Sequence, residues 1–430
     1  MLGATVNDDD ARRQAAEILQ AAAALSGDET TAEIRRTIAP NYGLISDDPI
    51  IRAEGPWLHT RGGKKIFDGV AAYSAANLGH GHPLVREVLR GFLDSHAPPV
   101  LGRFLGDPYL ALFGAKVTEL SGYDRFLPAN GGVEGPEAAI KLARRWAHQV
   151  KAVQGTPEIL YAHGCFHGRT TTVTQMFGDD EPEARDGFGP WTPGFRAIPY
   201  DDLAALEAAI TPNTAAVLIE PIQGEGGINI PAEGYLRDVV KLCREHNVLS
   251  IFDEVQTGWA RTGEMFCWMH EGVEARPDIM AIGKSVSGGY APVAGILADN
   301  ALMELMGAGS HGSTFGGSPI SSAIGYASLV AIEQEDLVAQ AQDKGARVMA
   351  RLTALAERTP RIAAVRGKGM MFGIEVTRED PDANVYSKAL LDLGAIVKST
   401  HRWVLRFTPP IVASDEDLDH VLGLIEQAFA

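Results

Sequence analysis

Short apolar runs alternate with helix-like periodicity along the middle of the chain. Runs typical of buried strands lie at residues 125 to 127, 158 to 162 and 215 to 220, and two more begin at Ile251 and Ile279. Between them, apolar residues recur at helical spacing over residues 107 to 121, 134 to 152 and 233 to 246. Such alternation predicts an α/β fold with an open, mainly parallel sheet that is covered by helices.

The two ends of the chain follow different patterns. Residues 8 to 25 predict an amphipathic helix, capped by aspartates, that packs on the body or on a second subunit. Short strands near residues 50 to 52 and 57 to 60 precede a glycine turn at 61 to 64, which indicates a hairpin. After residue 330 we expect a helix over 332 to 357, strands at 365 to 376 and 395 to 407, and a terminal helix from Asp415.

These changes of pattern predict three parts of the chain. Residues 61 to 330 form a large domain that contains the parallel sheet, and residues 331 to 430 form a smaller α+β domain. Residues 1 to 60 form an N-terminal arm that joins the smaller domain. The length is sufficient for such a division.

Composition narrows the class of protein. The 430 residues carry a formal net charge of -17, which argues against nucleic acid and anionic membranes as partners. Three cysteines, Cys165, Cys243 and Cys267, are too few and too scattered for a disulfide framework or a zinc cluster. The sequence has no apolar run of membrane length and no secretion signal. We therefore expect a cytoplasmic protein in a reducing compartment.

Two of the apolar runs deliver a charged side chain to a loop. One ends at Asp253, and the other ends just before Gly283 and Lys284. The pattern predicts a carboxylate and an amine at the carboxyl ends of two strands of one sheet. A pyridine aldehyde cofactor needs this pair, a lysine to form an imine and an acid to face the ring nitrogen.

The chemistry explains the residue types. A carboxylate about 4 Å from the ring nitrogen contributes about 4 kcal/mol at an effective dielectric of about 20, which is enough to keep that nitrogen protonated. A lysine loses its proton more readily when it is partly buried beside a cation.

Ordinary structural interpretations exist for both residues. An aspartate at a strand end often caps a turn, and a loop lysine is usually solvated. Gly283-Lys284-Ser285 is similar to the tail of a phosphate loop, but that motif requires glycine where Asp278 stands. The nucleotide interpretation is therefore excluded.

Two glycine-rich turns suit an anion. Asn130-Gly131-Gly132-Val133-Glu134 follows a strand and opens a helix, so its bare amides suit a phosphate, although a plain turn has the same composition. The segment from Gly312 to Gly317, which contains Thr314, offers hydroxyls and amides for the same anion. Its composition is also that of an ordinary loop.

Other loops carry groups that suit a substrate. Phe166 is suited to stacking on a flat cofactor, and Arg169 to a two-pronged contact with a carboxylate. Glu225 lies in a glycine-rich loop that lacks the third glycine of a dinucleotide fingerprint, so it is either solvated or functional. Arg406 interrupts an apolar strand and is either an edge residue or a second carboxylate clamp.

Histidines offer an alternative chemistry. His163, Cys165 and His167 are close in sequence, as are His80 and His82, but neither set includes a carboxylate at ligand spacing. We therefore predict no metal site and keep a metal-dependent hydrolase as a remote alternative.

Four longer segments together resemble the class III aminotransferases, which are pyridoxal phosphate enzymes of fold type I. They run from Val217 to Glu225, Asp253 to Gly263, Arg276 to Lys284 and His311 to Gly317. The resemblance extends from about Tyr42 to the C-terminus and is greatest to the members that act on ornithine. It implies pyridoxal 5'-phosphate as the cofactor and a homodimer with its active site at the subunit interface.

The resemblance also implies a role for each matching residue. Lys284 would bond the cofactor aldehyde, Asp253 would face the ring nitrogen, and Gln256 would donate to the phenolic oxygen. Phe166 would stack on the ring, while Gly132, Val133 and, from the neighbouring subunit, Thr314 would hold the phosphate. The substrate would meet Tyr42, Tyr73, Arg169, Glu225 and Arg406.

Glu225 and Arg406 would form a gate. In the family, such a glutamate neutralises the arginine while a diamine reacts, and then releases it to bind a dicarboxylate. The resemblance thus implies transfer of the δ-amino group of L-ornithine to 2-oxoglutarate, giving glutamate 5-semialdehyde and glutamate. The alternative is another ω-amino acid or diamine, such as acetylornithine, 4-aminobutyrate or diaminobutyrate.

The chain departs from the family pattern in three places. Gly131 replaces a threonine or serine, Gly135-Pro136 replaces alanine-glycine, and the Gly43-Leu-Ile-Ser-Asp-Asp sequence after Tyr42 differs from the usual arm. The first change removes one hydroxyl contact to the phosphate, and proline is tolerated in a first helical turn.

Overall fold

The central sheet has one strand that runs against the others. The computed structural model describes residues 8–178, 181–379 and 381–430. In this part of the chain, a seven-stranded sheet has the order β4 (Arg125–Ala129), β10 (Ala294–Ala298), β9 (Ile279–Ile282), β8 (Leu249–Asp253), β7 (Thr214–Ile219), β5 (Glu158–Ala162), β6 (Phe195–Ile198). Only β10 is antiparallel to its neighbours among these strands. The predicted mainly parallel sheet is confirmed.

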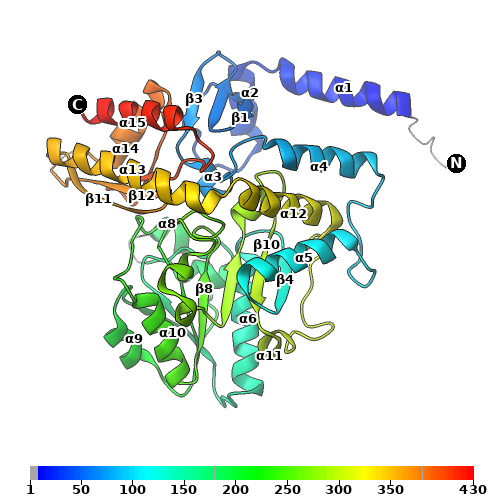
Figure 1. Ribbon diagram of the computed structural model, residues 1–430, viewed down its shortest axis with the longest axis vertical. Helices are drawn as coiled ribbons and strands as arrows, with labels where there is room; N and C mark the ends of the chain where they lie inside the picture. The colour runs from blue at the N-terminus through cyan, green and yellow to red at the C-terminus, as the bar shows by residue number, and fades with distance from the viewer. Residues whose placement is uncertain (1–7, 179–180, 380) are drawn as a thin grey trace.

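Helices cover both faces of this sheet (Figure 1). Residues that alternate along one strand enter different apolar clusters: Leu218 packs with α6 (Glu134–Gln149), and Val217 packs with α10 (Tyr235–Glu245). Strands β7 to β10 are buried along their whole length, as expected for strands covered on both faces.

Two smaller antiparallel sheets flank the central one in the described residues. One has the order β1 (Ile50–Glu54), β2 (Trp57–Thr60), β3 (Lys65–Asp68), and β13 (Ala395–Ile396) joins β3 in parallel, which unites both ends of the chain. The other has the order β11 (Ile362–Lys368), β12 (Met371–Val376), β15 (Val404–Phe407), β14 (Lys398–Thr400). The expected hairpin at residues 61 to 64 connects β2 and β3.

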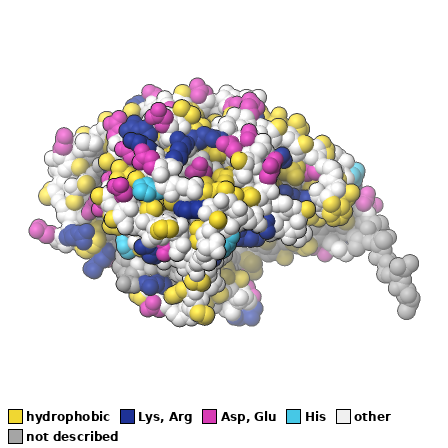
Figure 2. Space-filling model, turned by 90° about the horizontal axis from the view of Figure 1, so that it is seen from below, with side chains coloured by type: hydrophobic (Ala, Val, Ile, Leu, Met, Phe, Trp, Pro, Cys, Tyr) yellow, Lys and Arg dark blue, Asp and Glu magenta, His cyan; other side chains and the backbone are white. Residues whose placement is uncertain are grey.

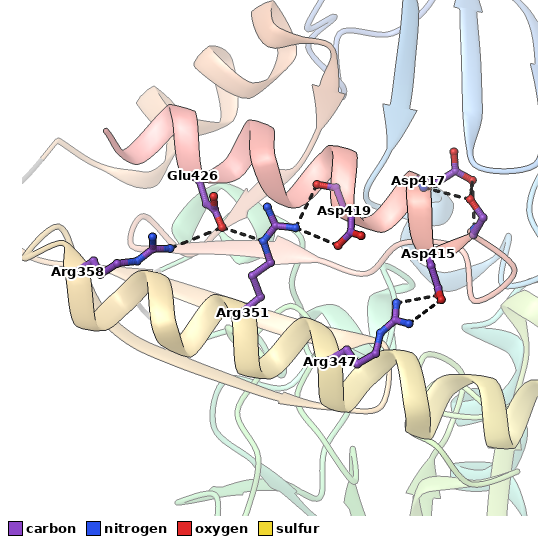
Figure 3. Close-up of polar contacts among 8 residues, drawn as sticks. Arg347, Arg351, Arg358, Asp415, Asp417, Asp419 and Glu426 are labelled. Atoms are coloured by element: carbon purple, nitrogen blue, oxygen red, sulfur yellow. Dashed lines mark hydrogen bonds and ion pairs between the residues drawn. The ribbon is translucent and has the colours of Figure 1, made fainter.

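Two helices, α13 (Leu337–Arg358) and α14 (Ala383–Leu393), lie against the second small sheet, and α15 (Asp415–Phe429) packs on both of them. Figure 3 shows the ion pairs that join α13 to α15, among them Arg347 with Asp415 at 2.7 Å and Arg351 with Glu426 at 2.8 Å. Each such partly exposed pair contributes about 1 kcal/mol or less, so buried apolar side chains between the helices supply most of the stability.

The remaining described helices include the mostly buried α12 (Pro319–Gln334) and several short turns. They are α1 (Asp8–Ala24), α2 (Gly27–Thr37), α3 (Ala71–Ser74), α4 (Pro83–Asp94), α5 (Pro108–Ser121), α7 (Thr171–Thr174), α8 (Pro182–Arg185), α9 (Leu203–Ala209), α11 (Asn300–Met303), α12 and the 3-10 helices η1 (Cys267–Glu271), η2 (Val273–Ala275) and η3 (Lys284–Ser287). None of the described helices is long and apolar enough to cross a membrane.

Two expectations for the C-terminal third are corrected. The helix predicted over 332 to 357 is two helices, α12 and α13, separated at Glu335 and Asp336. The first was missed because α12 is apolar or small on nearly every face, which leaves no helical periodicity to detect. The strand predicted over 365 to 376 is a hairpin that turns at Gly369, where φ is +55°.

The N-terminal helix extends away from the body (Figure 1). No residue of α1 is buried, and Ile18 and Leu19 are 70% and 71% exposed. The expectation that α1 packs on the body is therefore wrong. Its packing on a second subunit stays a prediction.

Surface charge is mixed where Figure 2 views the molecule. Lysine and arginine side chains lie among aspartate and glutamate side chains on this face rather than in a separate tract. The negative net charge is therefore distributed over a surface that also carries many basic groups.

Candidate active site

Asp253 and Lys284 lie at the same edge of the central sheet. Asp253 is the last residue of β8, and Lys284 follows the end of the neighbouring parallel strand β9 by two residues. Both side chains line one cavity of about 220 Å³. Its other lining residues are Gly132, Val133, Phe166, His167, Gly168, Glu220, Val255 and Gln256. The carboxylate and the amine therefore share one enclosed space.

The Asp253 carboxylate is held from two sides. Its Oδ2 lies 2.7 Å from Nδ1 of His167, and its Oδ1 accepts a hydrogen bond from the Val255 amide at 3.1 Å. Burial acts to lower the pKa of His167, but Cys165 and Asp253 outweigh it and raise the pKa well above the usual value. A cationic imidazole stabilises the ionised carboxylate. Asp253 thus caps a turn and also presents its carboxylate to the cavity in a fixed position.

Lys284 combines backbone strain with a weakened charge. Its φ of 51° lies in the left-handed region, which costs a non-glycine residue about 1 kcal/mol. Burial lowers the pKa of the Lys284 ammonium, Arg406 lowers it further, and Glu225 and Asp253 oppose the shift. In the part of the chain that the structure describes, its amine makes no hydrogen bond. The amine is thereby available for chemistry.

Gln256 is positioned by the absence of a side chain at Gly224. A Cβ at Gly224 would lie 1.6 Å from the Gln256 carboxamide oxygen, so a larger residue there would displace the Gln256 side chain. The Nε2 of Gln256 is buried and has no partner among the described residues. Gln256 lines the cavity of Asp253 and Lys284, so this unpaired N–H donor is available to a ligand there. The sequence alone gave no signal for the Gly224 contact.

Glu220 is a site residue that the sequence analysis did not select. It follows β7, is buried, and accepts hydrogen bonds from the amides of Phe166 at 2.8 Å and Gly224 at 3.0 Å. Burial raises its pKa to about 7. The carboxylate therefore fixes the two loops that carry Phe166 and Glu225. Its signal, a carboxylate that ends an apolar run, is the same one that selected Asp253.

The residues at the start of α6, Gly132 and Val133, also line the cavity. The first amides of a helix have no preceding turn to accept their hydrogen bonds. Among the described residues, the amides of Gly132 and Val133 donate to no protein group, whereas Gly131 donates to Glu134 at 2.9 Å. Two free amides at a helix N-terminus form an anion site. The residues present therefore fit a flat pyridine aldehyde that carries a phosphate.

A second cavity, of about 600 Å³, adjoins the first. Phe166 lines both cavities, and Arg169 and Glu225 line the second. The Glu225 carboxylate pairs with the Arg406 guanidinium, which is fully buried, while the Glu225 side chain is 33% exposed. Glu225, the more exposed partner, is therefore the one whose side chain has room to move.

Tyr73 lies beside this ion pair on a strained turn. The guanidinium carbon of Arg406 is 4.7 Å from the Tyr73 ring centre. Residues 71 to 74 all have φ between 47° and 68°, a left-handed turn that costs about 1–2 kcal/mol per residue. Lys398 donates a hydrogen bond to the Tyr73 hydroxyl at 2.6 Å. Sequence analysis did not single out Lys398, because a lysine in a short edge strand has no distinctive pattern.

Four expected site residues line neither cavity: Tyr73 and Arg406 contact each other beside the second cavity, whereas Tyr42 and Thr314 are exposed in a single chain. Tyr42 is 72% exposed and lines a third cavity of about 710 Å³, which also includes Arg169. Thr314 is exposed in the loop after α11, where the neighbouring Ser313 hydroxyl accepts a hydrogen bond from Asn130 at 2.8 Å. The structure therefore brings together the other expected residues but not Tyr42 and Thr314.

The histidines are directed to different carboxylates. His80 pairs with Asp68 at 2.8 Å and His82 with Glu335 at 2.6 Å, in a cavity that is separate from the one lined by His167. Within residues 8–178, 181–379 and 381–430, no three histidine, cysteine, aspartate or glutamate side chains are grouped to hold a metal.

Comparison with known proteins defines the class. The family model described as aminotransferase class-III matches residues 38–429, and the chain belongs to this family. The matched region includes every residue of the two adjoining cavities.

Individual relatives narrow the likeness. An ornithine aminotransferase of Brevibacillus brevis is 42% identical over 394 residues, covering 91% of this chain and 95% of the relative. An ornithine aminotransferase structure from Toxoplasma gondii has a TM-score of 0.90 at 33% identity and covers 98% of each chain. An acetylornithine aminotransferase structure from Elizabethkingia anophelis has a TM-score of 0.83 at 35% identity, covering 94% of this chain and 99% of that one.

Proposed function

We propose that this aminotransferase moves the δ-amino group of L-ornithine to 2-oxoglutarate, giving glutamate 5-semialdehyde and glutamate. The Glu225–Arg406 ion pair beside the cavity of Lys284 carries this proposal. A site for both substrates must accept a cationic tail and later an anionic one, which a movable ion pair allows. The likeness to ornithine aminotransferases supports the same donor.

Pyridoxal 5'-phosphate is the proposed cofactor. The amides of Gly132 and Val133 would bind its phosphate, and the free Nε2 of Gln256 would donate to its phenolic oxygen. Phe166 would cover its ring, and Asp253 would face its ring nitrogen. When bound, the cofactor supplies an electron sink for the substrate carbon that loses a proton.

The protein's own groups hold the charges and move the proton. The Asp253 carboxylate, held by His167, would face the ring nitrogen and favour its protonated form by about 4 kcal/mol at an effective dielectric of about 20. Lys284, whose pKa is lowered, would take the proton from the substrate carbon and deliver it to a carbon of the cofactor on the same side. Arg169 binds the α-carboxylate of ornithine from the second cavity.

A second copy of the chain completes this site. Thr314 is exposed and lies apart from the cavity in one chain, so its proposed phosphate contact requires a neighbouring subunit. Tyr42 is proposed to contact the α-amino group of ornithine. The minimal active unit is then a homodimer.

We also propose the division into residues 1 to 60, 61 to 330 and 331 to 430. All strands of the central sheet lie between Arg125 and Ala298, and the β11 to β15 sheet lies after residue 361. The cytoplasm is the proposed compartment, and the free, buried state of the three cysteines supports it.

A donor panel tests the substrate. The cofactor-loaded protein is mixed with L-ornithine, acetylornithine, 4-aminobutyrate or diaminobutyrate, and conversion to the aminated cofactor is followed by absorbance. The highest kcat/KM is expected for ornithine. A higher value for acetylornithine would instead support the second activity among its structural relatives.

A further inference from the structure

Lys398 occupies an unusual position beside the Glu225–Arg406 pair. It lies on β14 directly opposite Arg406 on β15. Residues directly opposite in an antiparallel pair project from the same face of the sheet, and two like charges there destabilise the sheet. The fold therefore keeps two cations together at a cost in stability.

The Tyr73 side chain contacts both of these cations. Lys398 Nζ lies 5.2 Å from the centre of the ring and donates to its hydroxyl, while Arg406 lies over the same ring. Among the described residues, the Lys398 ammonium has no carboxylate within ion-pair distance. Its hydrogen-bond partner is neutral, so its positive charge is not compensated locally.

The loop of Glu225 is anchored to the same strand. The Thr400 hydroxyl, two residues after Lys398, donates to the backbone carbonyl of Glu225. This bond fixes the backbone, so displacement of the Glu225 carboxylate needs only side-chain rotation. The Nε of Arg406 is also buried without a partner among the described residues. Donor capacity for an incoming carboxylate is thus already present.

We propose that Lys398 is a specificity-determining residue of the dicarboxylate subsite, where its ammonium acts with Arg406 once Glu225 has rotated away. The inference rests on the proposed function, in which Arg406 binds a carboxylate of the acceptor. With Glu225 in place the cluster of three groups carries one net positive charge, and with Glu225 displaced it carries two. A substrate carboxylate that enters then faces two positive charges, those of Lys398 and Arg406, and is attracted more strongly than by Arg406 alone.

Binding of glutarate, a dicarboxylate without a keto group, tests the proposal. The protein is loaded with pyridoxamine 5'-phosphate, and the Kd for glutarate is measured by calorimetry. Lys398→Gln, which keeps a donor for Tyr73 but loses the charge, is expected to weaken binding about tenfold. Lys398→Arg should recover most of the affinity. The control Lys388→Met removes an exposed lysine of α14 and should bind glutarate as the native protein does.

Kinetic measurements distinguish the loss of the Lys398 charge from a structural defect in the variant. In the reaction of the aminated protein with 2-oxoglutarate, Lys398→Gln should raise KM and leave kcat close to native. Tyr73→Phe keeps the ammonium and should weaken glutarate binding less than Lys398→Gln does. Should Lys398→Gln fail to fold, Lys398→Met is measured in its place.

Three results would overturn the proposal. They are native glutarate affinity in Lys398→Gln, an equal loss in Lys388→Met, and an equal loss in Tyr73→Phe. Because the aminated form is prepared without an amino donor, these results do not depend on ornithine. Failure of ornithine to convert the native protein would contradict the proposed donor alone.

Discussion

The two adjoining cavities differ in how their charges are held. In the first, Asp253 and Glu220 are buried and each accepts hydrogen bonds within the loops of one sheet. In the second, Glu225 comes from a loop of the central sheet and Arg406 from a different sheet. The first arrangement fixes a single geometry. The second includes an ion pair between the two sheets in which one partner is partly exposed.

This difference follows from the cost of a buried charge. Removing one partner of a fully buried pair costs about 3–5 kcal/mol, so Asp253 and His167 cannot readily separate. Arg406 is buried as deeply, but the Glu225 side chain reaches water and loses less on release. Arg406 therefore needs a carboxylate at all times, and either Glu225 or a substrate can supply it. Charged groups held in one geometry, such as Asp253 and His167, suit the reaction itself. An exchangeable pair, such as Glu225 and Arg406, suits the binding of substrates that differ in charge.

The largest effect is expected in the fixed cavity. Lys284→Ala removes the amine that we propose moves the proton, and turnover should fall by about 10⁴-fold. Steady-state assays measure the loss, and borohydride reduction followed by mass spectrometry should no longer label the protein. Lys388→Ala, on the exposed face of α14, is the matched control. Turnover within tenfold of native would show that another group carries the proton.

An intermediate effect is expected at the ion pair. Glu225→Ala leaves Arg406 without its neutralising partner, so donors with a cationic tail lose relative to donors without one. The ratio of kcat/KM for ornithine to that for 4-aminobutyrate should fall about tenfold, equal to about 1.4 kcal/mol. Glu183→Ala removes an exposed carboxylate of the third cavity and should keep the native ratio. An unchanged ratio in Glu225→Ala would remove the gate from the proposed function.

The smallest effect is expected in the pKa of Lys284, which depends on Glu225 and Arg406 beside the second cavity. Because burial lowers the pKa of Lys284 below its ordinary value of 10.5, the rate at which added pyridoxal phosphate bonds to the apoprotein should rise with pH and level off below that value. Glu225 stabilises the ammonium, so Glu225→Gln should move the midpoint to lower pH. Arg406 opposes the ammonium, so Arg406→Met should move it to higher pH. Stopped-flow absorbance measures both midpoints, and shifts of the opposite signs would contradict the coupling.

Local pattern was sufficient for much of the fold. Strand-like runs ending at Asp253 and before Lys284 predicted two strands of one sheet, and the structure has them as the neighbouring strands β8 and β9. Pattern failed for α12, because a helix buried on nearly every face has no polar side to mark its period. It succeeded for the helix α1, whose apolar stripe is uncovered in a single chain and whose packing on a second subunit stays a prediction.

The sequence by itself determined the reactive groups and the sheet that carries them, because apolar periodicity and the residue at each strand end are local properties. Only the tertiary structure decided which partners those groups meet. His167 lies 86 positions from Asp253, and Lys398 lies 325 positions from Tyr73. Such pairs form where separate loops and sheets converge, and no local pattern records the distance between them.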